Sequence, residues 1–520
     1  MMRSDHTRRF LDGTSAMLLH IYDRHRWRMV MPAGVSLILL WVLYASLATQ
    51  PFAALLWLPQ HAAASSSAKG LPAETTNALA VDTALLRDIV EYFADYPINH
   101  ETASSFGEMG RRTRVLGDWL TRADELEAAS ADRMALDAAI EALATQQFSF
   151  LARPPRHPDT PTPLADLRAT FAEGTTGIVV AAGDGTARFA GHLVAMLRDV
   201  LNSTLPIQIA YAGDDDLSLY HRARLAKVFG ETSKEASSPP PAFLDVTSVF
   251  DEATLRFDVA SGGWAVKAFA ALAAPFETVI VIDADAVFLQ PPEALLDAPG
   301  FRATGTLLFR DRLLWQHAFA DRHTWWHDQI RRPSSAMSAS RTWTEEYAEE
   351  GDSGVVVLDK GRPAVLAGLL HTAWQNTHAV REHTTYRITY GDKESWWLGL
   401  ELAGAPYAVE AHYGAIVGWD ESTDGTVNTR VCSFVIAHVD ATDCLLWYNG
   451  SLLKNKAVNS TEYALPDSWM IDGTWQKGAT KQDSSCMVGA PVKTLTIEET
   501  ARLRSACHAA AIVDDSFRPF

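Results

Sequence analysis

Residues 278–292 read TVIVIDADAVFLQPP, and this stretch decides how the chain folds. The run TVIVI at 278–282 predicts a strand buried on both faces, because its apolar residues do not alternate with polar ones. Asp283 and Asp285 follow directly. Two carboxylates at i and i+2 on an extended chain can reach one hard divalent cation together. The stretch therefore predicts a metal site at a strand end; the alternative is a solvated turn.

Other apolar runs surround this strand and alternate with helical patterns. Strands are predicted at 176–182, 207–212 and 354–358, and helices at 187–201 and 264–274. This alternation indicates an α/β fold with a mixed, mostly parallel sheet. In such sheets ligands bind at the carboxyl ends of the strands. Asp214, Asp215 and Asp216 also follow a strand, but the sequence AGDDDLS around them predicts a turn before the next helix.

Composition excludes several classes of protein. The 520 residues are 48% hydrophobic and 21% charged, which excludes a wholly disordered or collagen-like chain. With 45 basic and 63 acidic residues the formal charge is −18, so a broad nucleic-acid-binding face is not expected. The sequence contains no GxGxxG, GxSxG, Walker A or HExxH motif.

The N-terminus differs from the rest of the chain. Residues 1–28 carry six arginines and three aspartates, and residues 29–48 carry no charge. Twenty residues at about 1.5 Å each span the roughly 30 Å membrane core, so 29–48 is predicted to be a transmembrane signal anchor with a cytosolic tail at 1–28. A cleaved signal peptide and a buried soluble helix are the alternatives. The Ala/Ser/Thr-rich residues 49–80 predict a luminal stem.

Cysteines and glycosylation sequons agree with a luminal location. Cys432, Cys444, Cys486 and Cys507 all lie near the C-terminus and could form two disulfides, with three possible connectivities. N-x-[ST] sequons stand at Asn202, Asn449 and Asn459.

Four ordered segments resemble a known family. They are GGWAVKAFAALAAPFETVIVIDADAVFLQPPEALLD, EEGDSGVVVLDKGR, YGDKESWWLGLELAGAPY and HVDATDCLLWYNGSLLKNK. Together they resemble the fungal α-1,3-mannosyltransferases of glycosyltransferase family 71, over roughly residues 174–458. The resemblance implies a type II Golgi membrane enzyme with a GT-A fold. Such an enzyme would use GDP-mannose and Mn²⁺ (or Mg²⁺) to extend mannose chains on glycoproteins with retention of configuration.

The resemblance also suggests a domain organisation. The catalytic domain is expected at 174–460, after a helical region at 81–152 and a Pro-rich linker at 153–173. A C-terminal extension at 461–520 would carry two of the cysteines. The expected partners are a nucleotide-sugar donor, a mannose-containing glycan and, through one helix, the membrane.

Candidate site residues follow from the same segments. Asp283, Asp285 and His438 are the predicted metal ligands, with Asp440 as an alternative to His438. Contacts to the donor are predicted for Lys267, Lys454, Gly183 and Asp184, with Lys456 as a further phosphate candidate. Asp352, Asp392 and Glu394 are predicted to act on the sugars, whereas Trp396 and Trp397 are read as core residues. The alternative for each of these lysines is an ordinary solvated side chain, and the alternative for the glycine is an ordinary turn.

Other functions with the same features stay open. An α-1,2-mannosyltransferase, or a transferase of the same fold that uses UDP-glucose or UDP-galactose, would need the same acidic pair. A catalytically inactive, membrane-tethered glycan-binding protein is a third possibility. No catalytic nucleophile can be assigned from the sequence.

Overall fold

A computed structural model of the chain describes residues 81–100, 102–151, 162–232, 239–257, 262–421 and 429–517. The predicted cytosolic tail, membrane anchor and stem lie outside these ranges. The described residues belong to one compact unit. No helix among them is long and apolar enough to cross a membrane.

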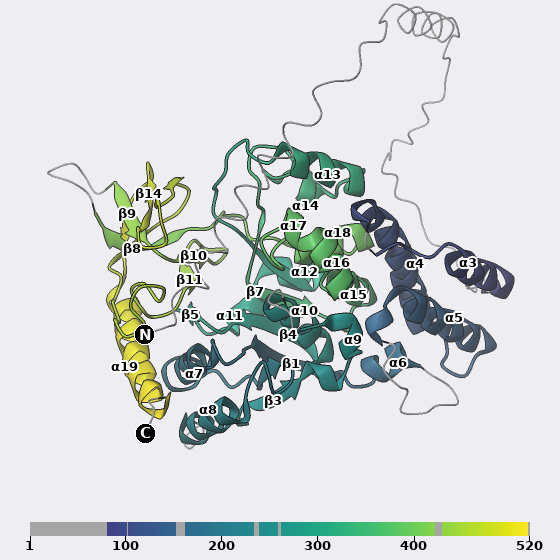
Figure 1. The fold of residues 1–520 in the computed structure, drawn as a ribbon, viewed down its shortest axis with the longest axis horizontal. Coiled ribbons are helices and arrows are strands. Elements are labelled where there is room, and N and C mark those ends of the chain that lie inside the picture. Colours follow the sequence, from purple (N-terminus) through teal and green to yellow (C-terminus); the bar gives the residue numbers. More distant parts are fainter. Residues whose placement is uncertain are drawn as a thin grey trace, which may run out of the picture. The chain divides into compact units, whose positions relative to one another are not determined.

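A six-stranded sheet forms the centre of this unit (Figure 1). In spatial order its strands are β3 (Ala242–Asp245), β2 (Ile207–Tyr211), β1 (Ala172–Ala181), β4 (Phe276–Asp283), β7 (Gly351–Asp359) and β6 (Thr306–Arg310). The first four are parallel, while β7 runs antiparallel to both β4 and β6. The sheet is therefore mixed and mostly parallel, which confirms the predicted α/β class.

The side chains of the central strands alternate between two hydrophobic cores. On β4, Val279 and Val281 face one core, whereas Ile280 and Ile282 face the other, and all four are fully buried. The first core is covered by α10 (Gly262–Ala273), α15 (Pro363–Gln375), α18 (Ser395–Ala403), α4 (Phe106–Asp124) and α5 (Ala131–Gln147). The second is covered by α7 (Ala187–Ala195), α8 (Leu219–Thr232) and α19 (Ile497–Phe517). Burial on both faces explains the unbroken apolar runs in the sequence.

Two smaller antiparallel sheets lie beyond the acidic turn. One has the order β10 (Ile436–Val439), β11 (Leu445–Asn449) and β5 (Ala286–Phe288). The other has the order β13 (Thr474–Gln476), β14 (Ser485–Val488), β9 (Arg430–Ser433), β8 (Ile416–Asp420), β12 (Ser468–Met470) and β15 (Lys493–Thr494). Residues of the predicted C-terminal extension thus complete a sheet that begins inside the predicted catalytic domain.

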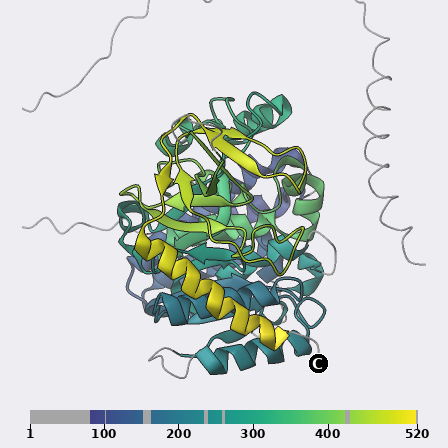
Figure 2. The ribbon, with the colours of Figure 1, turned by 90° about the vertical axis from the view of Figure 1, so that its left-hand side faces the viewer.

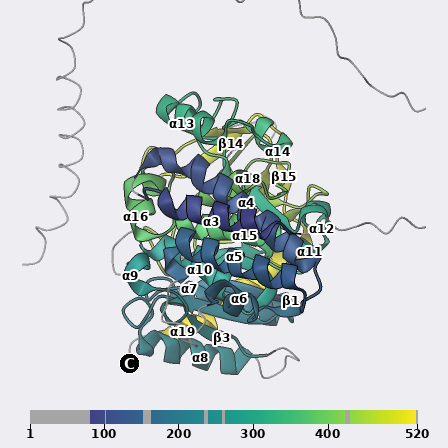
Figure 3. The same cartoon turned by 90° about the vertical axis from the view of Figure 1, so that its right-hand side faces the viewer.

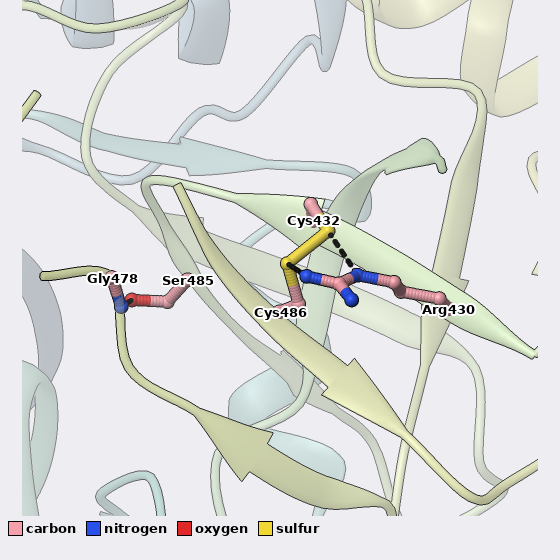
Figure 4. The surroundings of a disulfide bond; sticks show 5 residues. All are labelled: Arg430, Cys432, Gly478, Ser485 and Cys486. Atoms are coloured by element: carbon pink, nitrogen blue, oxygen red, sulfur yellow. Dashed lines mark hydrogen bonds between the residues drawn. A yellow bond between two sulfur atoms is a disulfide. The ribbon is translucent and has the colours of Figure 1, made fainter. Parts of the chain in front are cut away.

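A disulfide joins two strands of this second small sheet. Cys432 on β9 is bonded to Cys486 on β14, directly opposite in the strand register (Figure 4). Cys444 is exposed and Cys507 half-buried, and both are free. The described structure therefore has one disulfide where two were considered possible.

Helices occupy the stretch before the sheet. The helices α3 (Thr83–Asp95), α4 and α5 lie on one side of the unit, and α6 (Pro163–Arg168) falls within the predicted linker (Figure 3). Because α4 packs into the first core, this region shares its core with the α/β sheet. The remaining short helices are α9 (Glu252–Leu255), α11 (Ala294–Asp297), α12 (Pro299–Thr304), α13 (Ala320–Ile330), α14 (Ser335–Ser338), α16 (His378–Val380) and α17 (Tyr386–Ile388).

The last helix, α19, closes the opposite side of the unit (Figure 2). Its Asp514 carboxylate accepts hydrogen bonds from Arg188 and His192 of α7 and from the Tyr463 hydroxyl. Although burial raises the pKa of Asp514, these three donors hold it well below its usual range. The ionised carboxylate therefore fastens α19 to α7.

Candidate functional site

The acidic pair lies where β4 leaves the central sheet. Asp283 is the last residue of β4, and Asp285 stands in the turn before β5. The backbone carbonyl of Asp285 accepts hydrogen bonds from the amides of Gly450 (3.2 Å) and Ser451 (2.7 Å), which fixes the turn against the loop after β11. The two carboxylate side chains keep 27% and 17% of their surface exposed. They are thus held in place and open to a ligand.

Lys267 is a buried cation beside Asp283. It comes from α10, and its Nζ lies 3.0 Å from Oδ1 of Asp283 and 2.9 Å from Oδ2 of Asp392. The same Nζ donates to the carbonyl (3.1 Å) and hydroxyl (2.9 Å) oxygens of Ser353. Burial alone would lower the pKa of Lys267, but the charges of Asp283 and Asp392 raise it above its ordinary value. Lys267 is therefore a permanent positive charge between two carboxylates.

Asp392 is the innermost of these carboxylates. Its Oδ2 also accepts a hydrogen bond from the Trp396 indole at 2.8 Å. Burial raises the pKa of Asp392, an effect that Lys267 opposes. The prediction that Trp396 and Trp397 are core residues is confirmed, since each is only 2% exposed.

Two exposed aromatic side chains stand beside this ion cluster, and sequence reasoning gave neither of them a role. Trp264, one turn before Lys267 on α10, and Tyr390, two residues before Asp392, have ring centroids 5.5 Å apart. They are 47% and 63% exposed. Gly391 between Tyr390 and Asp392 has a φ of 66°, a turn conformation that glycine adopts without strain. Exposed aromatic faces next to charged groups suit the binding of a sugar ring.

His438 lies against Asp352. Its Nε2 is 3.1 Å from Oδ2 of Asp352, and its ring stacks on Trp447 with centroids 4.3 Å apart. Asp352 also accepts from the amide of Gly354. Burial raises the pKa of Asp352. The hydrogen bond from His438 and nearby positive charge outweigh this effect and bring the pKa of Asp352 below its usual range.

The structure does not gather the three predicted metal ligands into a closed cluster. Among the described residues, one group of three acidic, histidine or cysteine side chains has all its ligand atoms within 4.8 Å of one another. That group is Glu421, Cys432 and Cys486, and its two cysteines form the disulfide. Asp440, the alternative to His438, instead accepts hydrogen bonds from Thr442 and Gln290.

Glu394 lies behind the site. Its carboxylate accepts from the backbone amides of Glu350 (3.1 Å) and Gly351 (3.3 Å) and from the Trp397 indole. Burial raises the pKa of Glu394 to about 8. The contacts place Glu394 as a support for the start of β7, two residues after Asp392.

The predicted donor-contacting residues are placed differently from one another. Lys456 forms an ion pair with Asp285. Lys454 is exposed, 3.8 Å from Glu462. At the end of β1, the Asp184 carboxylate binds the amide and hydroxyl of Ser218 and lies 2.8 Å from His221. Lys456 therefore reaches the acidic pair, as Lys267 does, whereas Lys454 and Asp184 pair with other residues.

The structure agrees with a turn at the second acidic stretch. Asp216 accepts a hydrogen bond from the amide of Ala212 at 2.9 Å, and Asp214 pairs with Arg222 of α8. Gly183 packs against the Asp216 side chain, so the ends of β1 and β2 are held together here. These aspartates serve the local fold.

Asn449 is a site residue that sequence reasoning missed. Its Nδ2 donates to Oδ2 of Asp283 at 3.1 Å. The sequence presented Asn449 only as part of a glycosylation sequon, although it lies in one of the four family segments. The β5–β11 pairing, which sets Asn449 opposite Ala286, could not be foreseen from sequence spacing.

The acidic pair fits a divalent cation by its chemistry. Asp283 and Asp285 offer carboxylate oxygens, the ligands that Mg²⁺ and Mn²⁺ prefer. Lys267 and Lys456 form ion pairs with these two carboxylates and balance their charge.

Comparison with known proteins identifies the family. The model of the family Mannosyl_trans3, which describes mannosyltransferases, matches residues 175–440. The chain belongs to this family of mannosyltransferases, and the expected resemblance is confirmed.

Relatives in yeast carry a more specific name. Alpha-1,3-mannosyltransferase MNT3 of Saccharomyces cerevisiae is 29% identical over 291 residues, which cover 50% of this chain and 44% of MNT3. Alpha-1,3-mannosyltransferase MNN1 of the same yeast is 27% identical over 347 residues, covering 58% of this chain and 43% of MNN1. The chain spans about half the length of the curated relatives it matches.

Solved structures show only a weak likeness. The mannosyltransferase Ktr4p from S. cerevisiae is 8% identical, with a TM-score of 0.29 over 46% of this chain and 68% of Ktr4p. A TM-score this low carries no argument about fold or function.

Proposed function

We propose that this protein is a retaining glycosyltransferase of GT-A type that moves mannose from GDP-mannose to a mannose-terminated glycan on glycoproteins, forming an α-1,3 linkage. One observation carries the proposal: a chain of the mannosyltransferase family places two partly exposed carboxylates at the end of β4, beside the buried Lys267. The names of the yeast relatives support the α-1,3 linkage. A Golgi location and an N-terminal membrane anchor at 29–48 belong to the same proposal.

In this proposal Asp283 and Asp285 hold Mn²⁺ or Mg²⁺, with His438 as a candidate third ligand. The bound metal offsets the charge that develops on the diphosphate as its bond to the sugar breaks. Lys456, paired with Asp285, is placed to meet a phosphate oxygen. Lys267 holds the side chains of Asp283 and Asp392 in a fixed orientation. Asp352 and Asp392 are almost fully buried and orient the sugars in this proposal through the side chains that they hold, His438 and Lys267, while Glu394 supports the start of β7.

The test uses the purified full-length chain with GDP-mannose, Mn²⁺ and a panel of mannosides, followed by linkage analysis. Removing one charge-stabilising group costs about 10² to 10³ in rate, so we expect Asp283→Asn to lower kcat by about that factor. Asp214→Asn is the matched control because Asp214 is an exposed aspartate that pairs with Arg222 and has no contact with the acidic pair. Equal activity of wild type and Asp283→Asn would overturn the metal assignment.

The donor is tested by the melting temperature. We expect GDP with Mn²⁺ to raise it and UDP with Mn²⁺ to leave it unchanged. The reverse result would favour a UDP-sugar donor, and an α-1,2 product would correct the linkage. Binding of mannosides without transfer would favour a glycan-binding protein.

A further inference from the structure

A basic cleft lies beside the acidic pair. Its cavity of about 430 Å³ is of the size that binds small ligands. Five cationic side chains line it, and we call this set the basic cleft: Arg312, Lys454, Lys456, Lys477 and Lys481. One acidic residue, Asp483, shares the lining. Such a concentration of positive charge is unexpected in a chain with a formal charge of −18.

Anchored loops build the cleft. The loop between β13 and β14 carries Lys477 and Lys481, and at its base the Gly478 amide donates to the Ser485 hydroxyl at 3.2 Å, near the disulfide (Figure 4). On its outer side, Asn455 Nδ2 donates to the Lys481 carbonyl at 3.1 Å. The loop is thereby fixed both to the disulfide-bonded sheet and to the loop after β11. The lysines project from a fixed framework.

Three of the five cations have no ion-pair partner. Within the described part of the chain, no carboxylate lies within 4.0 Å of the charged nitrogens of Arg312, Lys477 or Lys481. Lys477 instead lies over the Trp315 ring, 3.9 Å from its centroid. The Asp483 carboxylate is used within the loop, where it accepts from the amide and hydroxyl of Thr480. Glu349 also interacts electrostatically with Arg312, so the charge that lacks a carboxylate partner among the described residues is that of Lys477 and Lys481.

The cleft is continuous with the candidate site. Lys456 lines the cleft and pairs with Asp285, and Gly450, another lining residue, donates its amide to the Asp285 carbonyl. In the proposed function, the donor diphosphate would lie at the end of the cleft that contains Lys456. Lys267, Lys456 and Asn449 are the residues whose side chains pair with the carboxylates of Asp283 and Asp285, so Arg312, Lys477 and Lys481 lie at the part of the cleft away from the acidic pair.

We propose that Arg312, Lys477 and Lys481 bind a negatively charged substituent of the acceptor glycan, either a phosphate ester or a uronic acid carboxylate. The inference rests on the proposed function, because it names the acceptor class of that same site. An acceptor held by its anionic substituent in the cleft presents a neighbouring sugar to the acidic pair.

The test compares three acceptors on the full-length chain: neutral mannobiose, mannobiose with a 6-phosphate, and mannobiose with a glucuronic acid branch. Two exposed ion pairs are worth up to about 1 kcal/mol each, so we expect the KM of an anionic acceptor to be about five- to thirtyfold below that of the neutral one. This preference should shrink in 0.5 M NaCl, a salt concentration chosen to screen exposed charges. In Lys477→Ala/Lys481→Ala the preference should fall to what Arg312 alone supplies, with kinetics on neutral mannobiose unchanged.

The control variant is Lys227→Ala/Lys493→Ala, which removes two lysines outside the cleft and should keep the preference. Calorimetric titration of each disaccharide in the absence of donor measures its binding to the cleft separately from catalysis. If no acceptor is mannosylated, the proposed function fails, while tighter binding of an anionic disaccharide that depends on Lys477 and Lys481 still supports the cleft. The proposed anion-binding role of the cleft is overturned if neutral and anionic disaccharides bind equally well, or if the double variant keeps the full preference for the anionic ones. The phosphate and uronic acid arms show which substituent is preferred.

Discussion

The side-chain amide of Asn449 donates a hydrogen bond to Asp283 across 3.1 Å, although the two residues are 166 positions apart. Asn449 is also the first residue of an Asn-Gly-Ser sequon. The nitrogen that would carry an N-glycan is the one that contacts Asp283. Glycosylation and an intact site are therefore incompatible at this position.

We expect Asn449 to remain unmodified in active enzyme purified from a eukaryotic host. Asn202 and Asn459 are exposed sequon positions and serve as internal references. Peptide mapping by mass spectrometry, with and without glycosidase, measures the occupancy of all three. A glycan on Asn449 in the active fraction would contradict the contact with Asp283.

Lys267→Met is expected to reduce both stability and activity. Removing one partner of a buried ion pair costs about 3 to 5 kcal/mol, because the remaining charges lose their compensation. Here Asp283 and Asp392 would be left facing each other's charge. Chemical denaturation measures the loss of unfolding free energy, and the transfer assay measures the loss of rate.

A second variant separates charge from packing at this position. Lys267→Met/Asp392→Asn removes one buried carboxylate together with the lysine, and we expect it to be more stable than Lys267→Met alone. If Lys267→Met were as stable as wild type, the ion cluster would have no structural role.

The contribution of Glu394 to stability should fall as the pH rises from about 5 to 8. Burial raises the pKa of Glu394 to about 8 in the folded protein, from 4.5. The folded state therefore holds a proton that the unfolded state has lost in this range, and the free energy of unfolding decreases by up to about 1.4 kcal/mol per pH unit from this one group. Glu394→Gln should flatten the dependence. Urea unfolding at pH 5, 6.5 and 8 measures both proteins, and parallel curves would refute the effect.

The disulfide is expected to stabilise the sheet that carries the basic cleft. Closing a loop between positions separated by 54 residues contributes about 2 to 4 kcal/mol. We therefore expect Cys432→Ser/Cys486→Ser to lower the melting temperature, whereas Cys444→Ser, which changes an exposed free thiol, should not. Equal melting temperatures for both variants would show that the bond contributes nothing measurable.

Local pattern was enough to predict the centre of the fold. The unbroken run at 278–282 predicted β4, and the aspartates after it predicted the acidic turn, because both features depend on neighbouring residues only. The run at 354–358 likewise predicted β7. Its antiparallel direction could not be read from the sequence, since a strand buried on both faces has the same apolar pattern in either direction.

Long-range partners were beyond reach of the sequence. The expected metal role of His438 stays a prediction, but its contact with Asp352, 86 positions away, was not foreseen. The pairing of Lys267 with Asp392 joins α10 to the turn before α18. Such contacts depend on how β7, β10 and β11 are arranged around β4, and no spacing along the chain encodes that arrangement.

The attachment of α19 predicts the effect of mutations that truncate the chain before this helix. Asp514 ties this helix to Arg188, His192 and Tyr463, and Leu503, Ala506 and Ala510 fill the second hydrophobic core. A nonsense mutation shortly before residue 497 would spare the whole segment 175–440 that defines the family, yet expose that core. Such an allele is expected to behave as a loss of function, not as a mild truncation.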